Sequence, residues 1–573
     1  MAGTATAPPI GIDLGTTYSS IAYLDRQGVP HCLTMKNGEC SIPSVVMLTE
    51  EGTCIVGELA LDQALIQPQR VIKHPKRKLG ERDFYWTIDG QRYTPLQVSS
   101  WILSYLLKCA QRDLKCPPIE YAVISIPAQF NEVQREATVQ AGYRAGLKKI
   151  DLINEPVAAT LCYLLGDDGM HFREVAQDER LLVADLGGGT YDLSLVHYRK
   201  DDIRVLATGG DPHLGGLDWN AKLLDLVLRK YRESTGIDLQ TPEHVIDLQR
   251  LHREIEVAKR KLSTEERVTI VCGTSQKIEK YQITRRDFEN LCQDLLERAR
   301  QCTTDLLKQA NLGWAHINTR LAVGGASRMP MFRAMLKQLA GRTVDTSVSP
   351  DQSIALGAAL QAGILLLQRG HDHVVQPSVA RKLKAVRQHV VNARPLGILV
   401  RDPHTQQRLP HYLLPANTPL PAERHETVGT VVDNQLRAHL RIIEGGIPSQ
   451  QRYVEIGTCV IDPLPPGLPA GAEIQVTLRY DDQARVHISA RIISSGQTAE
   501  VAFIRQENLL RNGHQVDGHG QDEREVVRVS PRSNGPTVVP PKLPGNARSL
   551  DEAIQQGEEE FFKKSTLRRG VPR

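Results

Sequence analysis

Residues 10–20 read IGIDLGTTYSS, and a second stretch of the same design, RLLVADLGGGTYDLSLVHY, occupies residues 180–198. In each stretch a run of apolar and β-branched residues reaches Asp-Leu-Gly, a turn of small residues follows, and a β-like run returns. A strand that turns back into a strand excludes the dinucleotide fingerprint and the Walker loop, because both lead from a strand into a helix. Two such hairpins predict a duplicated α/β fold whose halves face each other across a cleft.

Glycine and threonine in these turns have two explanations. They suit a plain hairpin turn for conformational reasons. They also suit an anion site, in which inward-turned N–H groups and hydroxyls face a phosphate and a nearby aspartate holds a hydrated magnesium ion. The repetition favours the anion site, since Asp13 and Asp185 open the two turns and Thr16 and Thr190 follow them. We therefore expect a clamp for ATP and Mg²⁺.

The composition excludes several classes of protein. Lysine and arginine total 70 against 66 acidic residues, and a net charge of +4 over 573 residues does not indicate nucleic acid or an anionic membrane as a partner. The N-terminus MAGTATAPPI has no leader pattern, and the apolar runs fall far short of the roughly 18 residues of a membrane span. Ten cysteines include no C-x-x-C pair and no zinc spacing, so we expect reduced thiols in a soluble, cytoplasmic protein.

Further stretches occur in an order that identifies a family: VISIPAQFNEVQREATVQAGYRAGL, LINEPVAATLCY, GGDPHLGGLDWN, VGGASRMP and SPDQSIALGAALQAG. With the two hairpins, they resemble the seventy-kilodalton heat-shock chaperone family (DnaK type). The resemblance is dense from about residue 10 to 365 and weaker from about 396 to 503. It implies a two-lobed α/β ATPase domain of the actin and sugar-kinase fold, followed by a β-sandwich.

The resemblance and the composition together divide the chain into four parts. We predict a nucleotide-binding ATPase domain over residues 1–367, a basic and helical linker over 368–395, a β-sandwich peptide-binding domain over 396–505, and a mostly disordered tail with a short terminal helix over 506–573. The family has a long helical lid after the β-domain. The tail is too rich in glycine, proline and charge to supply it, so we expect bound peptide to exchange quickly.

The resemblance implies a role for each hairpin residue. The first hairpin would bind phosphate through Gly15, Thr16, Thr17 and Tyr18, and the second through Gly187, Gly188, Gly189 and Thr190. Asp13 and Asp185 would lie near the magnesium ion. ATP or ADP with Mg²⁺ is therefore the expected cofactor.

Phosphoryl transfer depends on positioning and on charge stabilisation, and the family supplies a lysine and a water-orienting carboxylate for it. Alignment of QPQRVIKHPKRKLG puts the lysine at Lys76, and the NEP motif puts the carboxylate at Glu155. Four other basic residues crowd the lysine segment, so a solvated basic face is the alternative explanation of Lys76. An N-cap or solvated glutamate is the alternative for Glu155.

The resemblance also implies the residues that bind adenosine and those that couple nucleotide state to the second domain. The stretch RLHREIEVAKRKLS places four polar residues on one face of a helix. Taken alone, this pattern would indicate a solvent-exposed helix face. In the family such positions bind ribose and adenine, with the arginine of VGGASR stacking on the base. The residues implied are Glu256, Lys259, Arg260, Ser263, Gly325, Ser327, Arg328 and Asp351. Pro127 and Arg135 match family residues that relay nucleotide state; a rigid turn and a helix surface charge are the alternative explanations.

The linker departs from the family. Residues 369–394 carry six basic residues against one aspartate, and Val379, Leu383, Val386 and Val390 recur at heptad-like spacing. We predict a basic amphipathic helix that is either a packed connector or a surface for an anionic partner.

In the β-domain, DNQLRAHLRIIEGG fits the strand that forms the peptide pocket in the family. Val431, Ala438 and Leu440 are the predicted groove residues. At the position where the family often has a basic residue used by J-domain co-chaperones, this chain has Asp151, and a reversed surface charge there should weaken that contact.

We therefore predict an ATP-dependent chaperone that hydrolyses ATP slowly and binds unfolded or extended polypeptides, with a J-domain co-chaperone and a nucleotide exchange factor as further partners. The alternative is an ATP-sensing co-chaperone with one dedicated protein partner. A sugar kinase or an actin-like filament protein would not explain the C-terminal β-domain.

Overall fold

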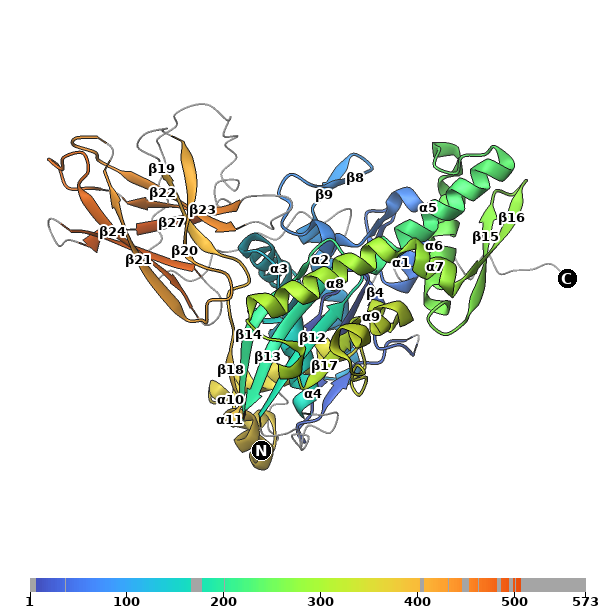
Figure 1. The fold of residues 1–573 in the computed structure, drawn as a ribbon, viewed down its shortest axis with the longest axis horizontal. Coiled ribbons are helices and arrows are strands. Elements are labelled where there is room, and N and C mark those ends of the chain that lie inside the picture. Colours follow the sequence, from blue (N-terminus) through green and yellow to red (C-terminus); the bar gives the residue numbers. More distant parts are fainter. Residues whose placement is uncertain are drawn as a thin grey trace. The chain divides into compact units, whose positions relative to one another are not determined.

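The computed structural model describes residues 7–36, 38–165, 178–199, 201–401, 407–430, 432–445, 453–461, 463–481, 486–493, 498–499 and 501–505. These residues form two compact units (Figure 1). Unit 1 comprises residues 7–130 and 134–388, and unit 2 comprises residues 131–133 and 389–505. The predicted tail and its terminal helix lie outside the described residues.

Unit 1 contains two mixed sheets, which define its first and second halves. The first sheet has the order β11-β10-β1-β2-β3, and β4 also pairs with β2. Its strands are β1 (Ile10–Asp13), β2 (Tyr18–Leu24), β3 (Pro30–Cys32), β4 (Ile42–Pro43), β10 (Tyr121–Ile126) and β11 (Lys149–Asn154). The second sheet has the order β17-β12-β13-β14-β18. Its strands are β12 (Asp178–Leu186), β13 (Tyr191–Arg199), β14 (Asp202–Asp211), β17 (Thr319–Val323) and β18 (Arg387–His389).

The two sheets repeat one strand arrangement. In the first, β1 runs parallel to β10 and antiparallel to β2, and β2 is antiparallel to β3. In the second, β12 runs parallel to β17 and antiparallel to β13, and β13 is antiparallel to β14. The turns β1–β2 and β12–β13 are the two hairpins of the sequence analysis, and they occupy equivalent places. A duplicated fold predicts this repeat.

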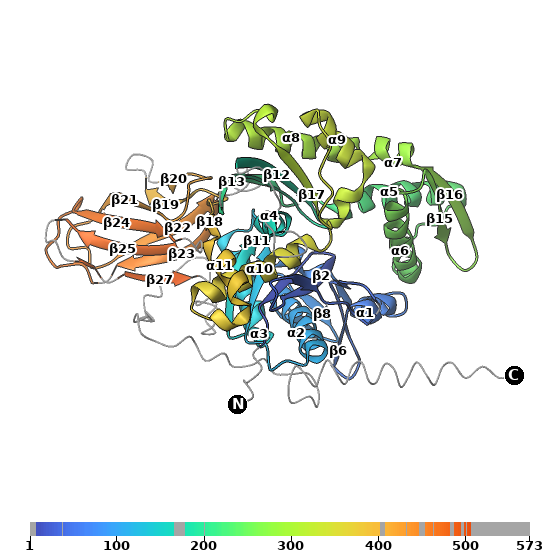
Figure 2. The ribbon, with the colours of Figure 1, turned by 90° about the horizontal axis from the view of Figure 1, so that it is seen from below.

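Two helices lie between the sheets. Helix α10 (Ser353–Gln368) packs on β1 and β2, α4 (Glu155–Leu165) packs on β12 and β13, and the two helices pack on each other. A Cβ on Gly11 would lie 2.0 Å from Ala359 N, and one on Gly357 would lie 1.8 Å from Ala158 O, so glycine is required at both close approaches. Figure 2 shows the blue elements of the first half and the green elements of the second to either side of α10.

The remaining helices of unit 1 surround these layers. They are α1 (Glu58–Gln63), α2 (Pro95–Leu114), α3 (Glu132–Arg144), α5 (Gly216–Thr235), α6 (Val245–Lys261), α7 (Arg285–Leu291), α8 (Gln293–Gln309), α9 (Pro330–Ala340) and α11 (Pro377–Ala385). Short strands complete the unit: β5 (Val45–Leu48), β6 (Cys54–Val56), β7 (Val71–Lys73), β8 (Trp86–Ile88), β9 (Gln91–Tyr93), β15 (Arg267–Gly273) and β16 (Ile278–Thr284).

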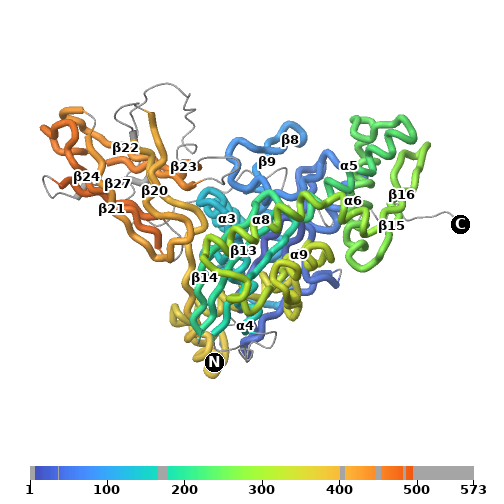
Figure 3. The backbone as a smooth tube through the Cα atoms, viewed as in Figure 1, coloured from blue at the N-terminus to red at the C-terminus, as the bar shows by residue number. Residues whose placement is uncertain are grey.

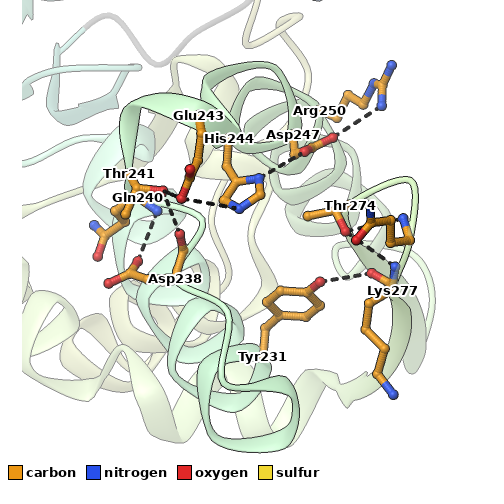
Figure 4. Close-up of polar contacts among 11 residues, drawn as sticks. Tyr231, Asp238, Gln240, Thr241, Glu243, His244, Asp247, Arg250, Thr274 and Lys277 are labelled. Atoms are coloured by element: carbon orange, nitrogen blue, oxygen red, sulfur yellow. Dashed lines mark hydrogen bonds and ion pairs between the residues drawn. The ribbon is translucent and has the colours of Figure 1, made fainter.

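Polar contacts fix the outer part of the second half, where α6 lies (Figure 4). Tyr231 on α5 donates a hydrogen bond to the carbonyl of Lys277 at 2.8 Å, and Thr274 Oγ1 accepts from the N–H of Lys277 at 3.3 Å, which holds the β15–β16 turn. At the start of α6, His244 Nδ1 lies 3.5 Å from Asp247 Oδ2. Leu251 and Ile255 bury one face of α6 and leave its polar stripe on another face.

The segment after α10 contacts both halves of unit 1. Gln376 N donates to Arg26 O at 2.8 Å, and a Cβ on Gly28 would lie 2.4 Å from Val379 Cγ1, so α11 packs on the β2–β3 turn of the first half. Arg387 N donates to Asp201 O at 2.9 Å, and β18 continues the second sheet beside β14. The prediction of one helix through all four heptad-like residues is wrong, because α11 ends at Ala385 and the chain becomes a strand.

Unit 2 consists of two sheets, whose strands follow one another in orange and red in Figure 3. The first sheet is β20-β19-β22-β23-β27 and the second is β21-β24-β25-β26. Their bounds are β19 (Leu396–Arg401), β20 (Arg408–Leu414), β21 (Ala422–Gly429), β22 (Ala438–Gly445), β23 (Tyr453–Ile461), β24 (Glu473–Tyr480), β25 (Val486–Ile492), β26 (Thr498–Ala499) and β27 (Val501–Arg505). Side chains of both sheets, including Ile398, Ile442 and Val476, share one apolar core. Every strand pair in the described part of this unit is antiparallel.

Two further observations bear on the composition. All ten cysteines are free thiols. Within the described residues, no helix is long and apolar enough to cross a membrane.

Candidate nucleotide site

The first hairpin loop is fixed by residues from outside it. Ser44 donates its hydroxyl to Gly15 O at 2.8 Å and its N–H to Thr17 O at 2.8 Å. His74 Nδ1 lies 3.2 Å from Thr16 O. Burial lowers the pKa of His74 to about 4, so the ring is neutral near pH 7 and the Nδ1 contact is a donated hydrogen bond. The backbone of the loop is therefore set before any ligand binds.

The second hairpin loop is closed by its own backbone and joined to a helix. Gly187 N donates to Thr190 O at 3.1 Å. The first N–H groups of α5 bind the loop, since Gly216 N donates to Gly187 O and Leu217 N donates to Gly188 O, both at 2.9 Å. Three consecutive glycines, Gly187 to Gly189, leave Thr190 as the side chain of this loop.

The two loops meet face to face. A Cβ on Gly188 would lie 2.0 Å from Thr17 Oγ1, and one on Gly189 would lie 2.9 Å from Thr16 Oγ1. The threonines of one loop thus fill the space that the glycines of the other leave open. The sequence analysis places phosphate on these two loops, and the structure brings them together.

Lys76 lies in a short 3₁₀ helix, Pro75–Lys78, and points inward. Its Nζ lies 2.6 Å from Glu155 Oε1, and both side chains are less than one-tenth exposed, at 6% and 7%. The Lys76 ammonium also lies 5.6 Å from the centre of the Phe130 ring. Neither residue is on a solvated face, which excludes the basic surface for Lys76 and the solvated glutamate for Glu155. Glu155 is the first residue of α4, so a role at the start of that helix stays open.

Three aspartates surround the Lys76–Glu155 pair. Burial, followed by the charge of Glu155, raises the pKa of Asp13 to about 6 and that of Asp192 to about 7. The same two causes raise the pKa of Asp185 well above its usual range. Burial lowers the pKa of Lys76, but the charges of Glu155 and Asp13 outweigh burial and raise it. When all four carboxyl groups are ionised, they place an excess of negative charge around one ammonium, and the raised pKa values reflect burial together with this excess.

This excess suits a divalent cation. Asp185 Oδ2 and Asp192 Oδ2 are buried without a hydrogen-bond partner in the described part of the chain. Asp13 Oδ1 accepts from Ser125 Oγ at 2.8 Å. Within the same described residues no three acidic, histidine or cysteine side chains are grouped to hold a metal alone. A magnesium ion here would need water or phosphate oxygens to complete its shell, which is the usual arrangement for this ion.

The basic segment around Lys76 also joins the two halves. Arg77 lies 2.8 Å from Asp218 at the start of α5 and donates to Gly189 O at 3.3 Å. Lys73 Nζ donates to Gln249 Oε1 on α6 at 2.7 Å. The crowding of basic residues that the sequence shows is therefore divided between the carboxylate cluster and contacts across the halves.

The predicted adenosine residues form a connected set on α6. Glu256 accepts from Lys259 Nζ and from Arg260 Nε, both at 2.9 Å, and Lys259 also donates to Gly216 O at 3.0 Å. The Arg260 guanidinium lies 4.8 Å from the centre of the Tyr18 ring, which brings this set to the first hairpin. Ser263 follows the helix and donates its N–H to Arg260 O at 3.0 Å.

The VGGASR segment forms a 3₁₀ turn, Gly325–Arg328, directly after β17. Ser327 is fully buried at 0% exposure, and its Oγ has no hydrogen-bond partner among the described residues. Arg328 is half-exposed and forms an ion pair with Asp351, which also lies against Gly325. A base that stacks on Arg328 would therefore meet a guanidinium already held in place.

The residues predicted to couple nucleotide state lie beside the Lys76 pair. Pro127 accepts from Phe130 N at 3.1 Å in a turn after β10. Arg135 donates to Phe130 O at 3.2 Å and lies 3.5 Å from Asn154 Oδ1, next to Glu155 in sequence. Both thus contact residues adjacent to the carboxylate cluster, and their relay role stays a prediction.

The sequence analysis missed Asp192, Arg77, Asp218 and Asn220. Asp192 had a readable signal, because DLGGGTYD has an aspartate at each end of a hairpin and Asp185 lies opposite Asp192 in the ladder. Like charges in directly opposed positions are unfavourable unless a cation lies near them. Asn220 donates to Glu256 at 2.5 Å, and nothing in the local pattern marks it.

The prediction that Asp151 is an exposed reversed charge is wrong. Asp151 is 9% exposed, lies 2.7 Å from Arg369 Nη1 and accepts from the Tyr121 hydroxyl at 2.9 Å. Arg369, just after α10, is too distant in sequence to be recognised as its partner. The charge of Asp151 is therefore neutralised inside unit 1.

We expect the Asp151–Arg369 pair to contribute measurably to stability. Asp151→Asn and Arg369→Met should each lower the free energy of unfolding of unit 1 by about 1–3 kcal/mol, because each leaves a largely buried polar partner unsatisfied. The double variant should lose less than the sum. Denaturant unfolding checks this.

The control for this comparison of single and double variants is the exposed pair Lys148–Glu120, whose side chains are 72% and 55% exposed. Glu120→Ala should change the free energy of unfolding by less than about 1 kcal/mol. Equal effects of Glu120→Ala and Asp151→Asn would contradict the assignment of a buried pair.

In unit 2, Ala438 and Leu440 lie on β22 at 9% and 8% exposure. Both belong to the apolar core of the unit. Val431 lies outside the described residues. A peptide groove at these positions stays a prediction.

A duplicated α/β unit with paired phosphate-type loops, joined to a two-sheet β unit, is the architecture of an ATPase with a separate binding domain. The family model described as Hsp70 protein matches residues 9–527. The chain is 36% identical over 507 residues to the chaperone protein DnaK of Thermotoga petrophila and to that of Thermotoga maritima, covering 87% of this chain and 81% of each relative. The chain belongs to the Hsp70 family.

Family membership gives the two units their general roles. The Hsp70 family has an actin-like ATPase domain and a β-sandwich, and it binds ATP and ADP.

Proposed function

We propose that unit 1 binds ATP and Mg²⁺ at its two facing hairpins and that the Lys76–Glu155 pair carries out hydrolysis. As a member of the Hsp70 family, the protein is an ATP-dependent chaperone that hydrolyses ATP. The observation that carries the site assignment is the buried 2.6 Å contact of Lys76 with Glu155 beside three aspartates and two apposed loops. No other region of the described chain combines these features.

The position of each site residue suggests its role in binding or hydrolysing ATP. The N–H groups and hydroxyls at Thr16, Thr17 and Thr190 would hold phosphate oxygens. Lys76 would stabilise the negative charge that develops on the transferred phosphoryl group. Glu155 would orient the attacking water by accepting its hydrogen bond. Asp13 and Asp185 would hold a magnesium ion, which would neutralise negative charge on the phosphate oxygens.

The base and ribose would lie between α6 and the Gly325–Arg328 turn. Glu256 accepts a hydrogen bond from Asn220 on α5, and Lys259 donates one to Gly216 O at the start of the same helix. The planar Arg328 offers a stacking surface for the base. The buried Ser327 hydroxyl, which lacks a partner among the described residues, is suited to hydrogen-bond the base.

Unit 2 would bind extended polypeptide, and ATP would control that binding. The support is its antiparallel two-sheet fold and the substrate binding of the family. Family membership also brings co-chaperones in general, and we propose a J-domain protein and an exchange factor among them. The alternative of an ATP sensor with one dedicated partner has no specific support, and a cytoplasmic location stays a prediction.

A turnover assay tests this function. ATP hydrolysis by the full chain should be slow and should rise several-fold on addition of a permanently unfolded polypeptide, because substrate and nucleotide binding are coupled. The folded form of the same polypeptide is the control. Stimulation by neither form, together with no release of bound polypeptide on adding ATP, would contradict ATP-controlled chaperone action.

A further inference from the structure

A pocket in the second half of unit 1 lies apart from the catalytic pair. It is an open hollow of about 220 Å³ between α9 and the segment that follows it. Arg333, Ala334, Lys337, Thr343, Val344 and Thr346 line it. We call this the basic pocket, since its charged lining residues are both cations.

The two cations of the basic pocket lie one helical turn apart. Arg333 and Lys337 are at i and i+4 on α9, where like charges face each other and destabilise a helix. Neither forms an ion pair with a described residue. The C-terminal end of α9 favours Lys337 through the helix dipole, but that effect fades within the last turn and does not extend to Arg333. The pair therefore has no ion-pair partner among the described residues; the acidic residue between Val344 and Thr346, Asp345, accepts the N–H of Ser347 at 2.8 Å.

Arg333 is held in a fixed orientation. Its Nε donates to Ser327 O at 3.0 Å, and no acceptor among the described residues takes its remaining N–H groups. Burial, and then the nearby charge of Arg328, lower the pKa of Arg333, so its close charged neighbour is another cation. A guanidinium fixed through one N–H, with others free, is a preorganised donor for an oxyanion.

Thr343 and Thr346 complete the lining with hydroxyl donors. Both are exposed, and they sit on the segment that leaves α9. Guanidinium, ammonium and hydroxyl donors around one hollow match the several oxygens of a phosphate group better than the two oxygens of a carboxylate.

We propose that the basic pocket binds a phosphate-bearing anion of the polyphosphate class, with Arg333 and Lys337 as its charge partners and Thr343 and Thr346 as hydroxyl donors. The site is separate from the two hairpins. It touches the nucleotide site through Arg333, which holds the carbonyl of Ser327. An anion here and a nucleotide there would change each other's affinity by the same factor.

Calorimetric titration of the full chain with inorganic tripolyphosphate tests the proposal. The buffer contains no nucleotide, because ADP is itself a polyphosphate anion that would compete for the basic pocket, and no divalent cation, so that the probe stays free of magnesium. Lys337 lies outside the two hairpins, so the binding that Lys337→Gln removes belongs to the basic pocket. Lys337→Gln should weaken binding at least about tenfold, because it removes a charge-assisted hydrogen bond. Thr346→Val should weaken it less, by roughly threefold.

The matched control is Lys230→Gln, which removes an exposed lysine of α5 outside the pocket and should leave the affinity unchanged. Citrate, a tricarboxylate, should bind at least about tenfold more weakly than tripolyphosphate. Equal affinity of the wild type and Lys337→Gln, or no binding at all, would overturn the proposal; equal binding of citrate would overturn its phosphate selectivity. Because ATP turnover is not the readout, this outcome is independent of the proposed chaperone function.

Discussion

Replacing Lys76 with alanine is expected to lower ATP turnover by at least about a hundredfold while ATP binding stays largely intact. The ammonium is buried against Glu155 at 2.6 Å, where loss of one preorganised charge that stabilises the transition state typically costs that much. The substitution also leaves Glu155 buried without its cation. The nucleotide-free protein should therefore unfold more easily, by about 3–5 kcal/mol. Single-turnover hydrolysis and denaturant unfolding measure the two effects.

Lys78→Ala is the matched control for Lys76→Ala. Lys78 lies in the same 3₁₀ helix, but it is 42% exposed and pairs with Glu81, which is 49% exposed. Its removal should leave turnover and stability nearly unchanged. Glu155→Ala should lower turnover at least tenfold, about 1.4 kcal/mol in the barrier. Wild-type turnover in Lys76→Ala would show that this lysine has no role in hydrolysis.

Gly188→Ala is expected to weaken ATP binding by roughly a hundredfold. The added Cβ would lie 2.0 Å from Thr17 Oγ1, so one loop must move away from the other. Displacement of binding groups by about 1 Å is enough to cost a factor of this size. Because the strain lies between the two halves, the free energy of unfolding should also fall, by about 1–3 kcal/mol. Equilibrium binding of a fluorescent ATP analogue measures the first effect.

Gly187→Ala provides the comparison on the adjacent residue. A Cβ there meets nothing closer than Thr190 O at 3.7 Å, which is ordinary contact, so ATP binding should change little. Combining Gly188→Ala with Thr17→Gly removes the obstructing hydroxyl and should restore part of the binding lost by Gly188→Ala alone. If Gly188→Ala binds ATP as tightly as the wild type, the loops do not form the phosphate site.

Much of the nucleotide site could be predicted because its signals are local. In each hairpin, the pattern of residues over about ten positions predicts a strand, a turn and a strand. Because the pattern occurs twice, it predicts that the two hairpin loops face each other. Strands β24 and β25 follow an equally local alternation of buried and more exposed residues, whereas β23 does not alternate. Lys76 and Glu155 came from family alignment, and their direct contact was beyond any local pattern.

The errors arose where a side chain is balanced by a residue far along the chain. Asp151 was predicted to be a surface charge because its partners, Arg369 and Tyr121, are remote in sequence and no local pattern indicates them. The helix predicted through Val390 stops early because Val379 packs against Gly28 and the next residues join β14 as a strand. Periodicity states which residues are apolar, but it does not state which partner will cover them.

The close fit of the two loops has a consequence for the repeat itself. The halves share a strand order, yet Thr17 occupies the space that Gly188 leaves empty. Two identical loops could not both occupy these positions. A pair of threonine loops would collide, and a pair of glycine loops would leave empty the space that Thr16 and Thr17 fill. The repeat is therefore symmetric in its backbone and complementary in its side chains. Exchanging the two loop sequences as a pair should be tolerated better than copying either loop into both places.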